Sequence, residues 1–97
     1  MYAVVRMMSV KPGHTMTSEI REETEALIRT MPGSLGQLTI DIGDDKFIRI
    51  ALWTSAEDRS ANVGTPADQR QREMYGAHLD QPIIGQGEVV SNTLQLV

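Results

Sequence analysis

The sequence predicts an α+β fold of the ferredoxin-like type, with two helices on one face of a four-stranded antiparallel sheet. The first observation is the spacing of hydrophobic residues, whose period changes along the chain in the order β-α-β-β-α-β. The second is a turn sequence, Gly43-Asp44-Asp45-Lys46, between the two central strands. The third is the length of 97 residues, which suits one domain spanning residues 1–97.

The first predicted strand and helix lie before residue 32. Tyr2 to Val10 is apolar at both parities except at Arg6 and Ser9, which is typical of a central strand covered on both faces. From Thr15 on, helical spacing is shown by the apolar residues Met16, Ile20, Leu27, Ile28 and Met31. Pro32-Gly33 predicts that this helix ends at Met31.

A hairpin and a broken helical segment follow. Apolar residues alternate with polar ones along both hairpin strands, at Leu38, Ile40 and Ile42 and again at Ile48, Ile50 and Leu52. Ser55 with Asp58 predicts a helix start, Gly64 predicts its end, and Thr65-Pro66 predicts a second start. We expect a loop from Asp80 to Gln86 and the last strand from Glu88 to Val97.

Composition and charge exclude several classes of function. The net charge of -4 does not favour nucleic acid or anionic lipid as a partner. The chain has no cysteine, which excludes disulfides and thiolate chemistry and fits a cytoplasmic location. No apolar stretch approaches the length of a membrane span. With two separated histidines and no phosphate-binding loop, we expect no metal site and no cofactor.

The two faces of the predicted sheet differ in chemistry. If Ile48, Ile50 and Leu52 face the helices, the alternation of side chains sends a mixed set to the uncovered face. That set comprises Phe47, Arg49, Ala51 and Trp53 from the hairpin and Val4, Arg6 and Met8 from the first strand. A face with both large apolar residues and arginines is expected to be buried by a second copy of the chain while enclosing a polar pocket. The sequence therefore predicts a homodimer that binds a small organic molecule.

Three short motifs resemble the antibiotic biosynthesis monooxygenase family of dimeric α+β barrels. They are Val10-Lys11-Pro12-Gly13 after the first strand, Met31-Pro32-Gly33 after the first helix, and Trp53-Thr54-Ser55 before an acidic helix start. The resemblance implies the family's fold over nearly the whole chain. The family includes cofactor-free monooxygenases that oxidise aromatic phenols to quinones, haem-degrading enzymes, and proteins of no known activity. The first strand departs from the haem-degrading members, since Arg6 stands about where they have an asparagine.

The resemblance also implies roles for individual residues. Trp53 falls at the tryptophan that lines the pocket in the aromatic-oxidising and haem-degrading members. Tyr75 and His78 lie where family members place polar pocket residues. His78 then acts as a general base and Tyr75 orients a substrate oxygen. The alternative for His78 is a solvent-facing side chain near a helix C-terminus.

The strand residues complete the candidate site. Arg6 and His78 are the predicted catalytic residues, and Arg6 would hold a phenolate or enolate anion. Trp53, Tyr75, Arg49 and Phe47 are the predicted substrate-binding residues. The alternatives are an ion pair of Arg6 with Asp41 or with a carboxylate of the partner chain, and a Trp53 that fills a subunit interface. His14 is expected at the surface, and Arg70 and Arg72 on a solvated helix face.

The function that these residues favour is a cofactor-independent monooxygenase acting on a small phenolic or quinol-like aromatic compound. A small-molecule-binding or stress-related module with the same pocket and no turnover is the alternative from another class. Haem degradation is the third possibility.

Overall fold

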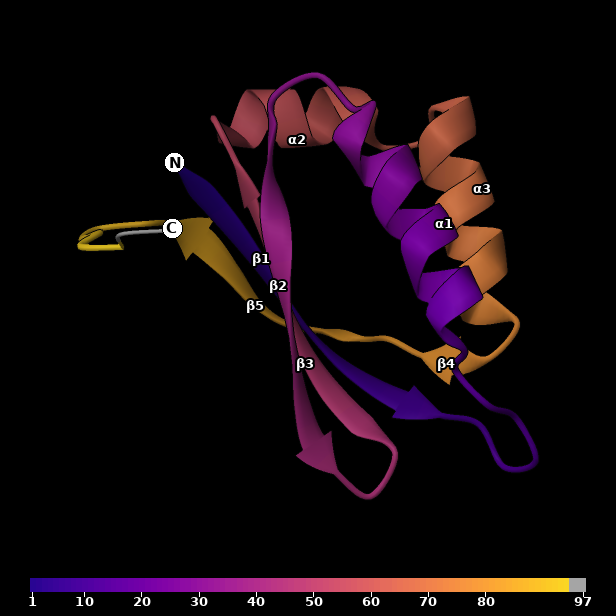
Figure 1. Ribbon diagram of the computed structural model, residues 1–97. Helices are drawn as coiled ribbons and strands as arrows, with labels where there is room; N and C mark the ends of the chain where they lie inside the picture. Colours follow the sequence, from indigo (N-terminus) through magenta and orange to yellow (C-terminus); the bar gives the residue numbers. More distant parts are fainter. Residues whose placement is uncertain (95–97) are drawn as a thin grey trace.

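The computed structural model describes residues 1–94, which form an α+β fold with three helices and an open antiparallel sheet of five strands. Figure 1 shows how these elements are arranged. The elements in chain order are β1 (Tyr2–Val10), α1 (Ser18–Arg29), β2 (Ser34–Gly43), β3 (Lys46–Trp53), α2 (Ala56–Asn62), α3 (Pro66–Gly76), β4 (Leu79–Asp80) and β5 (Ile83–Glu88). The ferredoxin-like fold class predicted from the sequence is therefore confirmed, with the helices on one face of the sheet.

The strands follow the order β2-β3-β1-β4, and β5 also pairs with β1. β4 pairs with the end of β1, at Ser9 and Val10, whereas β5 pairs with its first part, from Tyr2 to Arg6. Because β3 pairs with one edge of β1 along nearly its whole length, β4 and β5 share the other edge. Two short strands thus stand where the sequence predicted a single last strand, and the sheet has five strands instead of four.

The position of the last strand was predicted wrongly. Residues 83–86, which were expected to be loop, belong to β5, so that only the end of this strand overlaps the predicted one, and the described residues 89–94 form no strand. Gly85 and Gly87 have low β propensity and hide the alternation that marks a strand. Pairing with β1 overrides that propensity, and the Met7 amide also donates to the carbonyl oxygen of Pro82 at 3.1 Å. The predicted strand residue Gln95 lies outside the described residues.

The three helices begin where local hydrogen bonds cap them. The side chain of Thr17 accepts a hydrogen bond from the Ile20 amide, so α1 begins at Ser18, later than the predicted Thr15. Ser55 and Thr65 cap α2 and α3 in the same way. The prediction of two separate helix starts in this segment is confirmed. Within residues 1–94, no helix is long and apolar enough to cross a membrane.

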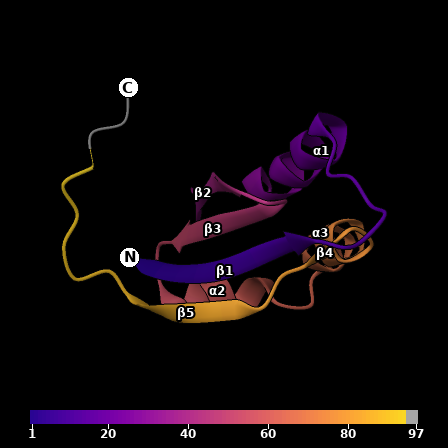
Figure 2. The same cartoon turned by 90° about the horizontal axis from the view of Figure 1, so that it is seen from below.

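The side chains of the central strands point in the direction opposite to the one predicted. Val4, Met8, Arg49 and Trp53 are buried beneath the helices, together with Tyr75 of α3. Figure 2 shows α1 and α3 on the same side of the sheet. The alternation could not decide the direction because β1 and β3 carry apolar residues at both parities. The assignment of Phe47, Arg49, Ala51, Trp53, Val4, Arg6 and Met8 to the uncovered face is therefore wrong.

The face of the sheet away from the helices is apolar and uncovered in a single chain. Cα partners across the strands share a face, so the alternating set lies there in rows: Val5, Ile50 and Leu38 in one, Met7, Ile48 and Ile40 in the next. The side chains of Leu38, Ile40 and Ile42 are 42%, 46% and 48% exposed. Three neighbouring apolar side chains with this exposure form a continuous apolar surface.

Candidate active site between the sheet and the helices

A cavity of about 60 Å³ lies between the helix-facing side of the sheet and the helices. One part of its lining is apolar, formed by Val4, Ile28, Met31, Ala51 and Trp53, and the other part is polar. The volume suits a few water molecules, so an aromatic ligand must displace side chains at the mouth. Val63 and Arg72 at the cavity are both about half exposed, which leaves room for that movement.

Trp53 forms the apolar wall because three segments hold the end of β3 in place. The residue packs against Val4 of β1 and Met31 after α1. The Thr54 amide donates to the Gly33 carbonyl oxygen at 2.9 Å, and the Thr54 hydroxyl donates to the Asp58 carboxylate. Gly33 has φ 82, a backbone conformation that a glycine adopts at little cost.

The polar lining contains two arginines from the central strands. Arg49 is 5% exposed, and its Nε and Nη1 atoms have no hydrogen-bond partner among residues 1–94. Its guanidinium carbon lies 5.1 Å from the ring centroid of Tyr75. Burial lowers the pKa of Arg49, whereas the neighbouring Tyr75 hydroxyl acts in the opposite direction.

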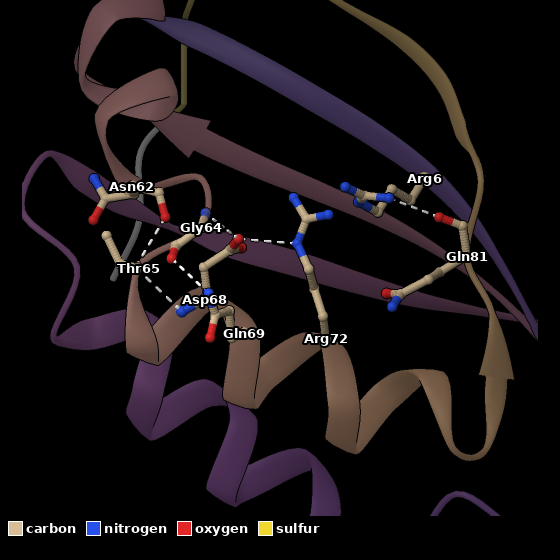
Figure 3. A network of polar contacts seen from close by, with 8 residues as sticks. All are labelled: Arg6, Asn62, Gly64, Thr65, Asp68, Gln69, Arg72 and Gln81. Carbon is tan, nitrogen blue, oxygen red and sulfur yellow. Dashed lines mark hydrogen bonds and ion pairs between the residues drawn. The ribbon is translucent and has the colours of Figure 1, made fainter.

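Arg6 lies in the strand next to Arg49 and directly opposite it in the register. Its Nη1 donates to the Gln81 carbonyl oxygen at 2.8 Å, as Figure 3 shows. Burial, followed by repulsion from Arg49, lowers the pKa of Arg6 to about 10. Arg6 therefore keeps its positive charge at neutral pH, although its surroundings disfavour that charge.

Helices α2 and α3 supply further polar groups. Arg72 extends from α3 toward the sheet, and its Nε lies 2.9 Å from Oδ2 of Asp68 (Figure 3). The same carboxylate oxygen accepts a hydrogen bond from the Gly64 amide at 2.8 Å. The Asn62 amide nitrogen donates to the carbonyl oxygens of Pro32 and Asp58, both at 2.8 Å, so this buried side chain fixes α2 to the end of the α1–β2 connection.

The structure brings three of the six predicted site residues together in this cavity: Arg6, Arg49 and Trp53. Tyr75 and Phe47 belong to the adjacent apolar cluster around Met8 and Leu79, where the Tyr75 ring contacts the guanidinium group of Arg49.

His78 lies elsewhere. Its Nδ1 is 3.3 Å from Nδ1 of His14, which is exposed as expected, and it does not line the cavity. Arg6 bonds to Gln81, and the described contacts include no ion pair between Arg6 and Asp41.

Sequence reasoning missed the contribution of α3. Asp68, Gln71, Arg72 and Tyr75 recur at helical spacing and form the face of α3 that points to the sheet. Because that stripe is mostly polar, it resembled a solvated surface, and the assignment of Arg72 to such a surface is only half right. Arg59 of α2 was missed as well, although it lines the cavity. Among residues 1–94, no three His, Asp or Glu side chains gather as a metal site would require.

Comparisons with known proteins support the fold. No protein-family model and no curated protein matches the sequence significantly. Solved structures do match. SnoaB, a cofactor-independent oxygenase from Streptomyces nogalater, is 14% identical with a TM-score of 0.80, and the match covers 97% of each chain.

Two further structures show the same arrangement. An antibiotic biosynthesis monooxygenase is 20% identical with a TM-score of 0.73, over 94% of this chain and 100% of that one. NE2512 of Nitrosomonas europaea, a protein of unknown function, is 14% identical with a TM-score of 0.76, over 99% and 95% of the two chains. The fold that the resemblance implies is thus confirmed, while a shared fold alone does not define the activity.

Proposed function

We propose that this chain is a cofactor-independent monooxygenase that oxidises a small phenolic or quinol-like aromatic compound. The observation that carries the proposal is the pairing, within one cavity, of the flat apolar surface of Trp53 with the guanidinium groups of Arg6 and Arg49. An indole surface suits an aromatic ring, and the two cations suit an oxygen that becomes negatively charged. The similarity of the fold to that of SnoaB supports the same class of reaction.

The arginines would act by stabilising the substrate anion. Positive charge in a partly buried cavity lowers the pKa of a phenol, so the reactive phenolate forms without a strong base. The electron-rich ring then reduces dioxygen. The reacting atom is the ring carbon para to the phenolate oxygen, which carries a hydrogen atom. One oxygen atom stays on that carbon as a carbonyl, the other leaves as water, and the phenol and dioxygen together yield a quinone and water.

Individual residues have distinct roles in this proposal. Arg6 and Arg49 bind the oxyanion, and Trp53 lies against the ring. Tyr75 positions Arg49 through its ring, and Phe47 packs beside Tyr75. His78 has no part in this scheme because its imidazole lies against His14 and outside the cavity.

The proposal includes a homodimer joined through the uncovered sheet face. The predicted interface residues Val4, Met8, Phe47 and Trp53 lie under the helices, so they cannot form it. The opposite alternation of β1, β2 and β3 provides a more uniformly apolar surface, with Ile40 and Ile42 close to half exposed. Burial of such a face by a second copy closes two sheets into a barrel. A cytoplasmic location, suggested by the lack of cysteine, belongs to the same proposal.

One observation favours the binding-module alternative. The cavity contains no histidine, and its carboxylate, Asp68, is already paired with Arg72 and with the Gly64 amide. A site without a free base can bind an aromatic anion and leave it unchanged. This alternative predicts binding without product.

Incubation of the chelator-treated protein with naphthols, anthrones and quinols, with and without dioxygen, tests the proposal. We expect quinone formation that requires dioxygen, survives the chelator and falls at least about tenfold in Arg6→Ala. Arg70→Ala, a change of an exposed α3 residue outside the cavity, is the control and should keep full activity. Binding of the whole panel without turnover would establish the binding module, and activity only after addition of iron or flavin would refute the mechanism.

A further inference from the structure

The cavity concentrates positive charge in an acidic protein. Arg6, Arg49, Arg59 and Arg72 line it, so four of the nine basic residues meet here, against the single carboxylate of Asp68. The protein as a whole has a net charge of -4. Like charges held together away from water raise the free energy of the folded state, unless a ligand of opposite charge neutralises them.

Arg49 is the strongest evidence for such a ligand. The side chain is 5% exposed and lines the cavity, and neither Nε nor Nη1 has a hydrogen-bond partner in the part of the chain that the structure describes. A buried guanidinium with unpaired donors is costly. Buried polar groups are normally satisfied, so these two donors indicate a missing acceptor.

Among residues 1–94, neither Arg49 nor Arg6 has an ion-pair partner, although the more distant Asp68 favours the charge of Arg6. Asp68 is engaged by Arg72 and by a backbone amide, as Figure 3 shows. Arg6 has a carbonyl oxygen as its partner, which satisfies one donor and supplies no negative charge. Repulsion from Arg49, Arg72 and Arg59 adds to burial in lowering the pKa of Arg6.

A phenolate alone matches this arrangement poorly. It carries one charge, which appears only after deprotonation, because an ordinary phenol has a pKa of about 10. A carboxylate is ionised at neutral pH, and its two oxygens fit the planar donors of arginine. The apolar lining by Val4, Met31 and Trp53 at the same time requires a hydrophobic body.

We propose that the ligand of this cavity is an aromatic carboxylic acid, whose carboxylate pairs with Arg49 while its hydroxyl oxygen faces Arg6 and its ring lies against Trp53. This inference rests on the proposed function only in placing the carboxylate and the oxidised hydroxyl on the same molecule. The binding of the acid group can therefore be measured separately from turnover.

Three matched probes test the proposal by titration calorimetry and by the fluorescence of Trp53, the one tryptophan of the chain. They are a hydroxynaphthoic acid with its two groups on different rings, the corresponding carboxamide, and naphthoic acid without the hydroxyl. We expect both acids to bind about ten- to a hundredfold more tightly than the carboxamide, with an affinity that falls as salt is added.

Two arginines of the same helix provide the matched variants. Arg72→Gln, at a half-exposed side chain that tolerates change, should weaken binding of the acids about three- to tenfold. Arg70→Gln removes a similar exposed arginine outside the cavity and should leave the affinity unchanged. Arg49→Met should lose most of the preference for acid over carboxamide, and its circular dichroism spectrum shows whether it is folded.

The outcomes separate this inference from the proposed function. Equal affinity for acid and carboxamide would overturn the inference, even if both compounds are oxidised. Tighter binding of inorganic phosphate than of either acid would also overturn it in favour of a phosphate site. Selective binding of the acids without any quinone would support the inference and refute the oxygenase.

Discussion

Replacement of Arg49 by methionine should make the protein more stable and should weaken the binding of an anion in its cavity. Methionine matches the arginine side chain as far as Nε, so it keeps the apolar stem beside Tyr75 and removes the charge. The change removes a guanidinium that is 5% exposed and has two unpaired nitrogens. It also removes one source of repulsion on Arg6.

The magnitude follows from the contacts of Arg49. Unpaired buried donors cost about 1–3 kcal/mol, and the contact with the Tyr75 ring at 5.1 Å returns about 0.5–2 kcal/mol. The net gain in the free energy of unfolding is therefore about 1 kcal/mol, or a rise in Tm of about 4–8 °C for a domain of this size. Functional sites typically retain groups that lower the stability of the fold because those groups are needed for binding.

Thermal unfolding followed by circular dichroism measures the effect, with the aromatic acid titrated into both proteins. Arg70→Met is the control, because its exposed side chain has one ion pair, to Glu23 at 3.6 Å, and should change stability by less than about 0.5 kcal/mol. A lower Tm for Arg49→Met would mean that the guanidinium stabilises the fold. The reasoning that this charge is retained for a ligand would then be refuted.

Two further predictions concern the uncovered sheet face and the turn after α1. Ile40→Lys should be a monomer of 10.7 kDa in light scattering, whereas Thr39→Lys, on the opposite face of β2, should remain a dimer of twice that mass. Equal masses for the two variants would refute this interface. Gly33→Ala should lower the free energy of unfolding by about 2–4 kcal/mol, since φ is 82 and the new Cβ would lie 2.6 Å from that of Asp58. Gly13→Ala has a similar φ of 78 but open space, so chemical denaturation should show a loss of only about 1 kcal/mol, and equal losses would contradict the proposed close contact.

The elements of the fold could be predicted because local chemistry specifies them. Ser55 and Thr65 cap their helices through their own side chains, and the turn between β2 and β3 follows from Gly43 and the residues after it. The last strand could not be found in the same way. β5 contains Gly85 and Gly87 and depends on pairing with β1, which is a long-range contact.

The candidate site could not be located from the sequence because the alternation of residues does not show which face of the sheet the helices cover. β1 and β3 are apolar at both parities, and arginines are rarely buried, so Arg49 favoured the wrong direction. The same residue, found buried and unpaired, is the main evidence for an anion site. Arg6, Arg49 and Trp53 were selected correctly as neighbours because residues two or four apart on a strand, and Cα partners across strands, share a face.

Oxidation of a naphthol under isotopically labelled dioxygen tests the proposed oxygenase most directly. The chelator-treated protein is incubated with substrate, the quinone is reduced at once to prevent exchange with water, and the product is analysed by mass spectrometry. The proposed reaction predicts one labelled oxygen atom in each product molecule, with loss of the product in Arg6→Ala and full yield in Arg70→Ala. Product without label, or label that appears only after iron or flavin is added, would contradict it.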